Sequence, residues 1–344
     1  MSPATKARRP LGVRLLIWLG LGILVIVVLL ALVLLALREP DTDGVAMRAK
    51  YTNAASQFIE LSPGTRVHVR DEGPRDGPVV MLLHGSNASL HTWEPWVARL
   101  VDRYRVVTLD FPAHGLSGAV PNRDYSTDSY VAIVEAVRLK LKIDRMVLGG
   151  NSMGGGVAWR YAVAHPERLA GLVLVDASGK PMPAGSKPPL GFYLARIPMA
   201  RDILASVTPR WIIERSLIQS VSVTGIVDDA MIDRYWELLL YPENRQATLD
   251  RFSQYNPPGD GEALRKLDVP TVILWGREDR LIPVTVADWF AERLPNARVT
   301  VLDGVGHIPM EEAPDRSLVP LLRLLSEVYA TPASPAPAAA AAGG

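Results

Sequence analysis

The stretch 149-GGNSMGGG-156 decides the fold, because five of its eight residues are glycine and a serine stands among them. Glycine destabilises the interiors of helices and strands, so this density indicates a backbone that bends sharply or approaches a neighbour closely. The apolar run before it, DRMVL from Asp144, is typical of a short buried strand. The segment from Val157 places apolar residues at helical spacing until Pro166 signals a stop. The glycines therefore occupy a strand-to-helix turn.

Within this turn, Gly150–Gly154 fits the G-x-S-x-G pattern of a nucleophile elbow. Such a turn exposes the hydroxyl of Ser152 at the end of a strand, and small neighbours let the strand and the helix approach each other. The N-terminus of the following helix directs backbone N–H groups at developing negative charge. A phosphate-binding loop would need a Lys followed by Ser or Thr at its end, and this stretch has no lysine. The pattern predicts that Ser152 is a nucleophile.

Apolar runs alternate with segments of helical spacing, which predicts an α/β fold with a mostly parallel sheet flanked by helices. Two strands are expected within residues 55–73. Further strands are expected in the runs that begin at Pro78, Arg105, Arg145, Leu169, Pro270 and Ala297. Helices are expected at 92–102, 126–142, 153–165 and 284–294. We expect one core, residues 55–178 and 267–329, that binds ligands at the carboxyl ends of its strands.

The alternation stops between residues 179 and 266. This segment begins rich in proline and continues with two helical patterns, one around Trp211–Ile218 and one around Met231–Leu239. It is too long for a structureless loop in a compact domain. We interpret it as a helical cap inserted over the strand ends. The alternative is a second helical lobe that does not touch the site.

The N-terminal region predicts a membrane anchor. Residues 15–37 contain no charge and no proline, and at ~1.5 Å per residue they can cross a bilayer core of ~30 Å. The main alternative is a cleavable signal peptide, whose apolar region is typically ~7–15 residues. Basic residues precede the span and acidic residues follow it. The positive-inside rule then predicts a single-pass protein with residues 1–14 in the cytoplasm and an extracytoplasmic catalytic domain.

The segments before and after the catalytic domain have less distinct sequence patterns. We expect residues 38–54 to be a linker between the anchor and the core. Residues 330–344 are rich in alanine and proline and carry no charge, which is typical of a disordered tail.

The composition excludes several classes of function. The 37 basic residues nearly balance the 36 acidic ones, and no basic stripe suggests a nucleic-acid partner. The chain has no cysteine, so thiol catalysis and disulfides are excluded. The six histidines form no H-E-x-x-H pair. We therefore expect neither a metal nor a cofactor.

A serine nucleophile needs a histidine base and an acid that orients the base, here in the chain order Ser, Asp or Glu, His. Asp279 and His307 each follow a predicted strand, and they come after Ser152 in this order. We predict that His307 is the base and Asp279 the orienting acid. Asp176, which ends the preceding strand, and Glu278 are the competing acids.

The oxyanion of an acyl intermediate needs two N–H donors. The backbone N–H of Met153, directly after the nucleophile, is one candidate. The other is the N–H of Ser86, in the loop that follows the strand from Pro78, where Gly85 lets the backbone bend. His84, in the same loop, is interpreted as structural.

Five motifs together resemble the α/β-hydrolase superfamily over about residues 55–329. They are HGSNAS from His84, DFPAHGLSG from Asp110, GGNSMGGG from Gly149, GREDRLIP from Gly276 and GVGHIPMEE from Gly304. The resemblance implies the roles predicted above for Ser152, Asp279 and His307. It also implies that Asp110–Gly115 is a structural turn, in which Ala113 replaces a glycine often seen in the family. Similar dehalogenases and epoxide hydrolases use an aspartate at the elbow, so the serine disfavours those activities.

The resulting hypothesis is a membrane-anchored serine hydrolase that cleaves a carboxylic ester through an acyl-enzyme on Ser152. The anchor suggests a lipid-like substrate such as a monoacylglycerol. Trp93 and Trp96 are expected to line an acyl pocket; the alternative is that they pack as ordinary core residues. A carboxylesterase for small esters stays open. Carbon–carbon bond hydrolases that resemble this chain carry the same three residues and are the enzymatic alternative. The non-enzymatic alternative is a membrane-tethered ligand-binding protein.

Overall fold

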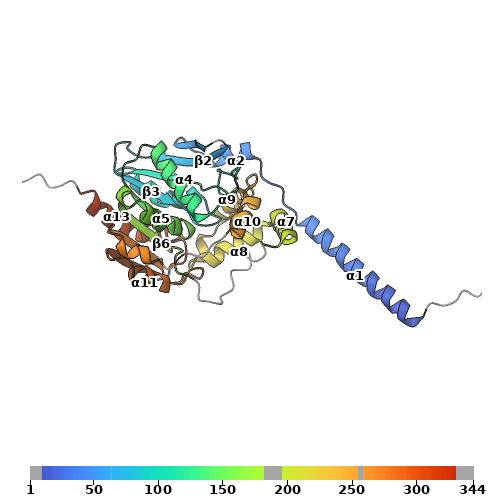
Figure 1. The fold of residues 1–344 in the computed structure, drawn as a ribbon. Coiled ribbons are helices and arrows are strands. Elements are labelled where there is room, and N and C mark those ends of the chain that lie inside the picture. Colours follow the sequence, from blue (N-terminus) through green and yellow to red (C-terminus); the bar gives the residue numbers. More distant parts are fainter. Residues whose placement is uncertain (1–9, 63, 182–195, 255–258, 260, 331–344) are drawn as a thin grey trace, which may run out of the picture.

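An eight-stranded sheet forms the centre of the computed structural model, which describes residues 10–62, 64–181, 196–254, 259 and 261–330 (Figure 1). Its strand order is β1-β2-β4-β3-β5-β6-β7-β8. The bounds are β1 Ser56–Ser62, β2 Thr65–Glu72, β3 Val79–Leu83, β4 Arg105–Leu109, β5 Met146–Asn151, β6 Leu169–Val175, β7 Thr271–Gly276 and β8 Ala297–Leu302. Strands β3 to β8 run parallel, and β2 pairs antiparallel with both β1 and β4. The predicted α/β fold with a mostly parallel sheet is confirmed.

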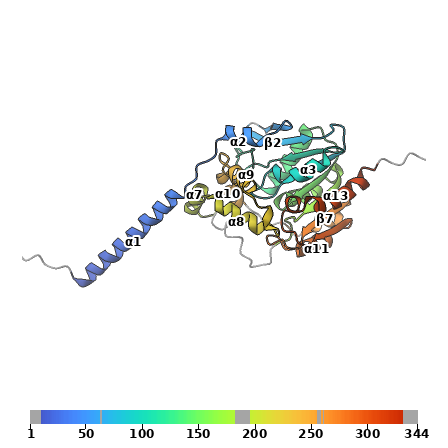
Figure 2. The ribbon, with the colours of Figure 1, turned by 180° about the vertical axis from the view of Figure 1, so that it is seen from behind.

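Helices cover both faces of this sheet. Successive side chains of a strand point to opposite faces. Met81 and Leu83 of β3 accordingly join one core cluster with α4 (Thr127–Lys140), α5 (Met153–Ala164) and α11 (Thr285–Ala291). Val80 and Leu82 join the other with α3 (Glu94–Leu100) and α13 (Pro314–Val328). Helices α4, α5 and α11 face the viewer in Figure 1. Helices α3 and α13 face the viewer in Figure 2.

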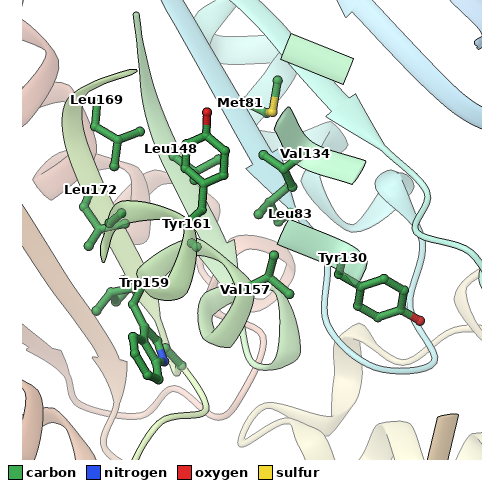
Figure 3. Packing of buried hydrophobic residues seen from close by; sticks show 14 of the residues in the cluster. Met81, Leu83, Tyr130, Val134, Leu148, Val157, Trp159, Tyr161, Leu169 and Leu172 are labelled. Atoms are coloured by element: carbon green, nitrogen blue, oxygen red, sulfur yellow. The ribbon is translucent and has the colours of Figure 1, made fainter. Parts of the chain in front are cut away.

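Helix α5 is held tightly in the first cluster, and it begins directly after Ser152. Val157 and Tyr161 are fully buried, and Figure 3 shows them among side chains from β3, β5, β6 and α4. The Tyr161 hydroxyl also donates to Glu135 of α4 at 2.6 Å. This packing fixes the position of the helix whose N-terminus carries the turn.

In the described part of the segment between β6 and β7 there are four α-helices, where the sequence indicated two. They are α7 Pro198–Ser206, α8 Arg210–Ser220, α9 Asp229–Leu239 and α10 Asn244–Ser253. Most of the proline-rich start of this insertion, 182–195, lies outside the described residues. The insertion is attached to the core: Asn244 Nδ2 donates to the carbonyl oxygen of Gly115 at 2.9 Å. We call residues 196–266 the cap below.

The predicted linker 38–54 is not an open linker. It contains α2 (Gly44–Tyr51), which Asp43 caps by accepting the N–H groups of Val45 and Ala46. Lys50 and the Tyr51 hydroxyl both bind Glu237 of α9. Contacts between residues nearly two hundred positions apart are invisible to local sequence patterns, which explains why the helix was missed.

Helix α1, Leu11–Ala36, projects away from the domain beside α7 in both views (Figures 1 and 2). It has a mean hydropathy of 3.3 over its most apolar window, and none of that window is buried. Its length and composition suit a helix that crosses a membrane, and they also suit a signal sequence.

A substitution at Gly154 tests the packing of α5 on the sheet. A Cβ at this position would lie 2.2 Å from the carbonyl oxygen of Leu83, a backbone atom that cannot move away cheaply. We expect Gly154→Ala to lower the free energy of unfolding by about 1–3 kcal/mol or more, seen as a lower midpoint in thermal unfolding. Gly225→Ala is the matched control, because a Cβ there meets nothing within 4 Å. Equal midpoints for the two variants would contradict this account.

Candidate active site

Ser152 occupies a strained backbone conformation between β5 and α5. Its φ is 53° and its ψ is −115°, a region that a non-glycine residue adopts only when its surroundings enforce it. The Ser152 N–H donates to Val175 O at 3.0 Å, and the Ser152 carbonyl accepts the N–H groups of Gly156 and Ser178. These bonds hold the serine at the carboxyl end of β5, as expected for a nucleophile elbow.

The loop after β3 lies directly against this serine. A Cβ on Gly85 would come within 2.9 Å of Asn151 Oδ1 and 3.2 Å of Ser152 Cβ. Ser86 follows Gly85 and Met153 follows Ser152, so the loop and the turn that carry the two predicted oxyanion donors lie beside each other. Their donation to a substrate oxygen remains a prediction.

His307 and Asp279 are paired. The Nδ1 atom of His307 lies 2.7 Å from Oδ2 of Asp279, and both side chains are buried. The other carboxylate oxygen of Asp279 accepts the N–H groups of Leu281 and Ile282 at 2.7 and 3.0 Å. Asp279 is thereby fixed with one oxygen free to orient the imidazole, the geometry that a triad acid requires.

Asn151 connects the serine to the histidine. Its Nδ2 donates to the carbonyl oxygens of Val175 and His307, the latter at 3.0 Å. No hydrogen bond joins Ser152 Oγ to His307 Nε2, although both residues are described. Such a bond is often loose without substrate and tightens in the complex. Apart from its place in the elbow motif, nothing in the sequence indicated this role of Asn151.

Two carboxylates outside the triad hold the loop before His307. Glu278 accepts the N–H of Val305 at 3.0 Å, and Glu312 accepts the N–H of Gly306 at 2.7 Å. Glu278 is therefore occupied as a loop anchor, and the structure pairs Asp279 with the histidine instead. The two adjacent glutamates of GHIPMEE were the signal in the sequence that could have indicated Glu312. Its hydrogen bond with Gly306 could not be predicted from the spacing of residues.

Asp176, the other competing acid, is fully buried beside the pair. One of its oxygens accepts the N–H of Gly276 at 2.9 Å, and Oδ2 has no partner. Burial and then the negative charge of Asp279 raise the pKa of Asp176 well above its usual range. A proton on Asp176 would remove the repulsion between this carboxyl and the negative charge of Asp279.

Single ligand atoms of Asp176, Asp279 and His307 lie within 4.8 Å of one another, a spacing that could also hold a metal ion. The direct contact of 2.7 Å between Asp279 and His307 leaves no space for an ion between those two atoms. The hydrogen-bonded pair is the arrangement that the geometry favours.

The loop histidine and the Asp110 turn take structural positions. His84 is fully buried, and its Nε2 accepts the N–H of Phe111 at 3.0 Å. Asp110 accepts the N–H groups of Leu90 and Leu116 and contacts His68 at 2.8 Å. Burial opposes the charge of Asp110, but the hydrogen bond and the charge of His68 lower its pKa below its usual range.

A second set of hydrogen-bonded Ser, His and Asp side chains, Ser56, His68 and Asp110, lies at that turn. His68 also contacts Ser56 Oγ at 3.0 Å, but the Ser56 hydroxyl is engaged by the backbone and side chain of Asn53. Ser56 begins strand β1 and is not part of a strand-to-helix turn. The three residues therefore have the composition of a triad but lack a nucleophile elbow.

Trp93 and Trp96 lie in the second core cluster and are fully buried. The Trp96 indole N–H donates to Ser317 Oγ at 3.0 Å. Side chains without exposed surface offer nothing to a substrate in this conformation. The structure therefore gives no support to an acyl-binding role, and ordinary core packing accounts for both.

The family model for the alpha/beta hydrolase fold matches residues 78–314 of the chain. The chain belongs to the alpha/beta hydrolase fold family. This hydrolase is 30% identical over 294 residues to a 2-hydroxy-6-oxononadienedioate/2-hydroxy-6-oxononatrienedioate hydrolase from Paraburkholderia phymatum, across 82% of this chain and 97% of that protein.

Solved structures of this fold resemble the hydrolase along most of its length. A meta-cleavage product hydrolase from Pseudomonas fluorescens matches with a TM-score of 0.68 and 23% identity, over 79% of this chain and 97% of that chain. A membrane phospholipase A described as a bacterial virulence factor matches with a TM-score of 0.67 and 24% identity, over 92% of this chain and 99% of that chain. At these identities the structural likeness supports the fold alone.

Exchanging each candidate acid for its amide tests which one orients His307. We expect Asp279→Asn to lower kcat by about 10³–10⁴-fold, because it disturbs the tautomer and stabilisation of the imidazole. Asp176→Asn should change kcat by less than about tenfold, because the amide oxygen can still accept the N–H of Gly276 and the side chain stays neutral. Steady-state kinetics of the two variants on any substrate that the hydrolase turns over tests this prediction. A larger loss of kcat in Asp176→Asn than in Asp279→Asn would make Asp176 the triad acid.

The titration of Asp176 predicts a pH dependence of stability. Its raised pKa means that the folded chain keeps a proton that the unfolded chain loses above the ordinary carboxyl range. The contribution of this group to stability is therefore full at low pH and falls as pH rises. The gain in thermal midpoint of Asp176→Asn over the parent should grow as the pH rises above the ordinary carboxyl range. The exposed Asp315→Asn is the control, and a gain independent of pH would refute a proton on Asp176.

Proposed function

We propose that this hydrolase is a membrane-anchored serine enzyme that cleaves a carboxylic ester through an acyl-enzyme on Ser152. One observation carries the proposal: the strained serine adjoins Asn151, which is bonded to the carbonyl of His307, while the His307 ring is paired with Asp279. An exposed hydroxyl, a base and an orienting acid are the three parts that nucleophilic acyl transfer needs.

The chemistry follows from these positions. Ser152 Oγ attacks the ester carbonyl while His307 Nε2 accepts its proton, and Asp279 stabilises the imidazolium through Nδ1–H. The N–H groups of Ser86 and Met153 receive the charge on the carbonyl oxygen. His307 returns the proton to the departing alcohol, and an acyl-enzyme remains. Water activated by His307 then releases the acid and restores the serine.

The attachment of the cap to the anchor supports a lipid-like ester. The N–H of Glu39, just beyond α1, donates to Ser206 O of α7 at 2.9 Å. Exposed apolar side chains on α7 and α8 include Ile203, Trp211 and Ile212. A cap that is bonded to a membrane helix and exposes such residues suits an enzyme working at a bilayer surface.

A carbon–carbon bond hydrolase is the second candidate, and the 30% identical relative that hydrolyses 2-hydroxy-6-oxononadienedioate favours it. The same serine, histidine and aspartate would act on a ketone carbonyl in place of an ester. The two candidates differ in the bond broken, so direct turnover assays separate them.

The full-length chain in detergent should hydrolyse p-nitrophenyl esters, and Ser152→Ala should reduce turnover by at least about 10³-fold, because it removes the nucleophile. A rise in kcat/KM from acetyl to palmitoyl would indicate a lipid-like substrate. The 2-hydroxy-6-oxononadienedioate is assayed in parallel.

Three results would redirect the proposal. Turnover of the dienedioate without turnover of any ester would establish the carbon–carbon candidate. Ester turnover unchanged in Ser152→Ala would place the reaction elsewhere. Binding of an ester without turnover in the parent chain would indicate a membrane-tethered binding protein.

A further inference from the structure

Arg251 of α10 places a buried guanidinium against the predicted oxyanion loop. Its Nη2 donates to Ser86 Oγ at 2.5 Å, and its Nη1 lies 3.4 Å from Met153 Sδ. Ser86 and Met153 are the two residues whose backbone N–H groups are predicted to bind the oxyanion. A cap residue thus reaches the reacting end of the site, next to Ser152.

This cation has no counter-charge in the described part of the chain. Arg251 is only 9% exposed, its Nε has no hydrogen-bond partner, and no described carboxylate forms an ion pair with it. The neighbouring Asp250 is already bound by Arg123 and Arg201. The contacts that remain are neutral: a hydroxyl, a thioether and the ring of Phe252, 4.6 Å away.

Other arginines of the cap are paired where they meet the core or the anchor segment. Arg234 binds Glu311, and Arg245 binds Asp41. An uncompensated buried charge is costly, so a chain that pairs these neighbours and leaves Arg251 unpaired has left one position open for an anion. The fork of N–H groups on a guanidinium matches the two oxygens of a carboxylate or a phosphate.

We infer that Arg251 binds an anionic oxygen group of the substrate, a carboxylate or a phosphate carried near the scissile carbonyl. This inference rests on the proposed ester hydrolysis and adds the chemical class of the ester. The alternative role is structural, in which Arg251 only steadies the Ser86 loop. A structural role affects neutral and anionic esters alike, whereas an anion site affects only the charged ones.

The experiment compares matched neutral and anionic esters on the full chain in detergent micelles. The carboxylate arm uses p-nitrophenyl hexanoate against the mono-p-nitrophenyl ester of adipic acid. The phosphate arm uses 1-oleoylglycerol against 1-oleoylglycerol 3-phosphate. The variants are Arg251→Gln and Arg251→Lys. Arg210→Gln is the control, because it removes a cap cation bound to Asp229 and Asp233 on the surface.

We expect Arg251→Gln to lower kcat/KM for at least one anionic ester by about ten- to a hundredfold, the range for a hydrogen bond to a charged group. Its neutral partner should change less than about threefold. Arg251→Lys should retain part of the preference, and Arg210→Gln all of it. Loss in the adipate arm alone identifies a carboxylate substrate, and loss in the phosphate arm alone identifies a phosphate ester.

Equal losses on neutral and anionic esters, or no loss on either, would overturn the inference. Binding is measured separately in Ser152→Ala, by calorimetry with monoethyl adipate, ethyl hexanoate and glycerol 3-phosphate, with and without Arg251→Gln. If the parent cleaves no ester, the proposed function fails, and this measurement still decides the anion site. Affinity for both anions that is unchanged by Arg251→Gln would then refute it.

Discussion

The strained turn at Ser152 is the constraint on which the rest of the site depends. A positive φ at a non-glycine residue costs of order 1–3 kcal/mol and persists only where the surroundings enforce it. Here the enforcement is steric. A Cβ on Gly154 would meet the Leu83 carbonyl at 2.2 Å, and one on Gly155 would meet Ala177 Cβ at 2.5 Å. The glycines allow α5 to pack closely on the sheet, with Ser152 at the carboxyl end of β5.

Charge is distributed unevenly on the two sides of this serine. On the histidine side, burial and the charge of Asp279 raise the pKa of Asp176, which favours a neutral carboxyl beside Asp279. On the oxyanion side, the buried cation of Arg251 contacts Ser86 and Met153. Acyl transfer moves positive charge toward the first side and negative charge toward the second. The arrangement of the fixed groups therefore agrees with the direction in which charge develops.

The cap connects regions of the molecule that the core keeps apart. Its Ser206 accepts a hydrogen bond from the segment after α1, and the Ser220 carbonyl accepts the N–H of His307 at 2.7 Å. Arg251 reaches the loop after β3. The segment after α1, His307 and the loop after β3 are thus all bonded to one helical insertion. A movement of the cap would alter both ends of the site together.

The sequence by itself determined the sheet, its flanking helices and the elbow, because strand and helix periods and the glycine cluster are local signals. It also placed Asp279 and His307 at strand ends, in an order that restricted their roles. Only the tertiary structure decided that Asp279 rather than Asp176 contacts His307, that residues 44–51 form a packed helix, and that Arg251 lies unpaired beside Ser86. Each of these depends on contacts between distant segments, and the free energy of a buried charge is set by what surrounds it in space.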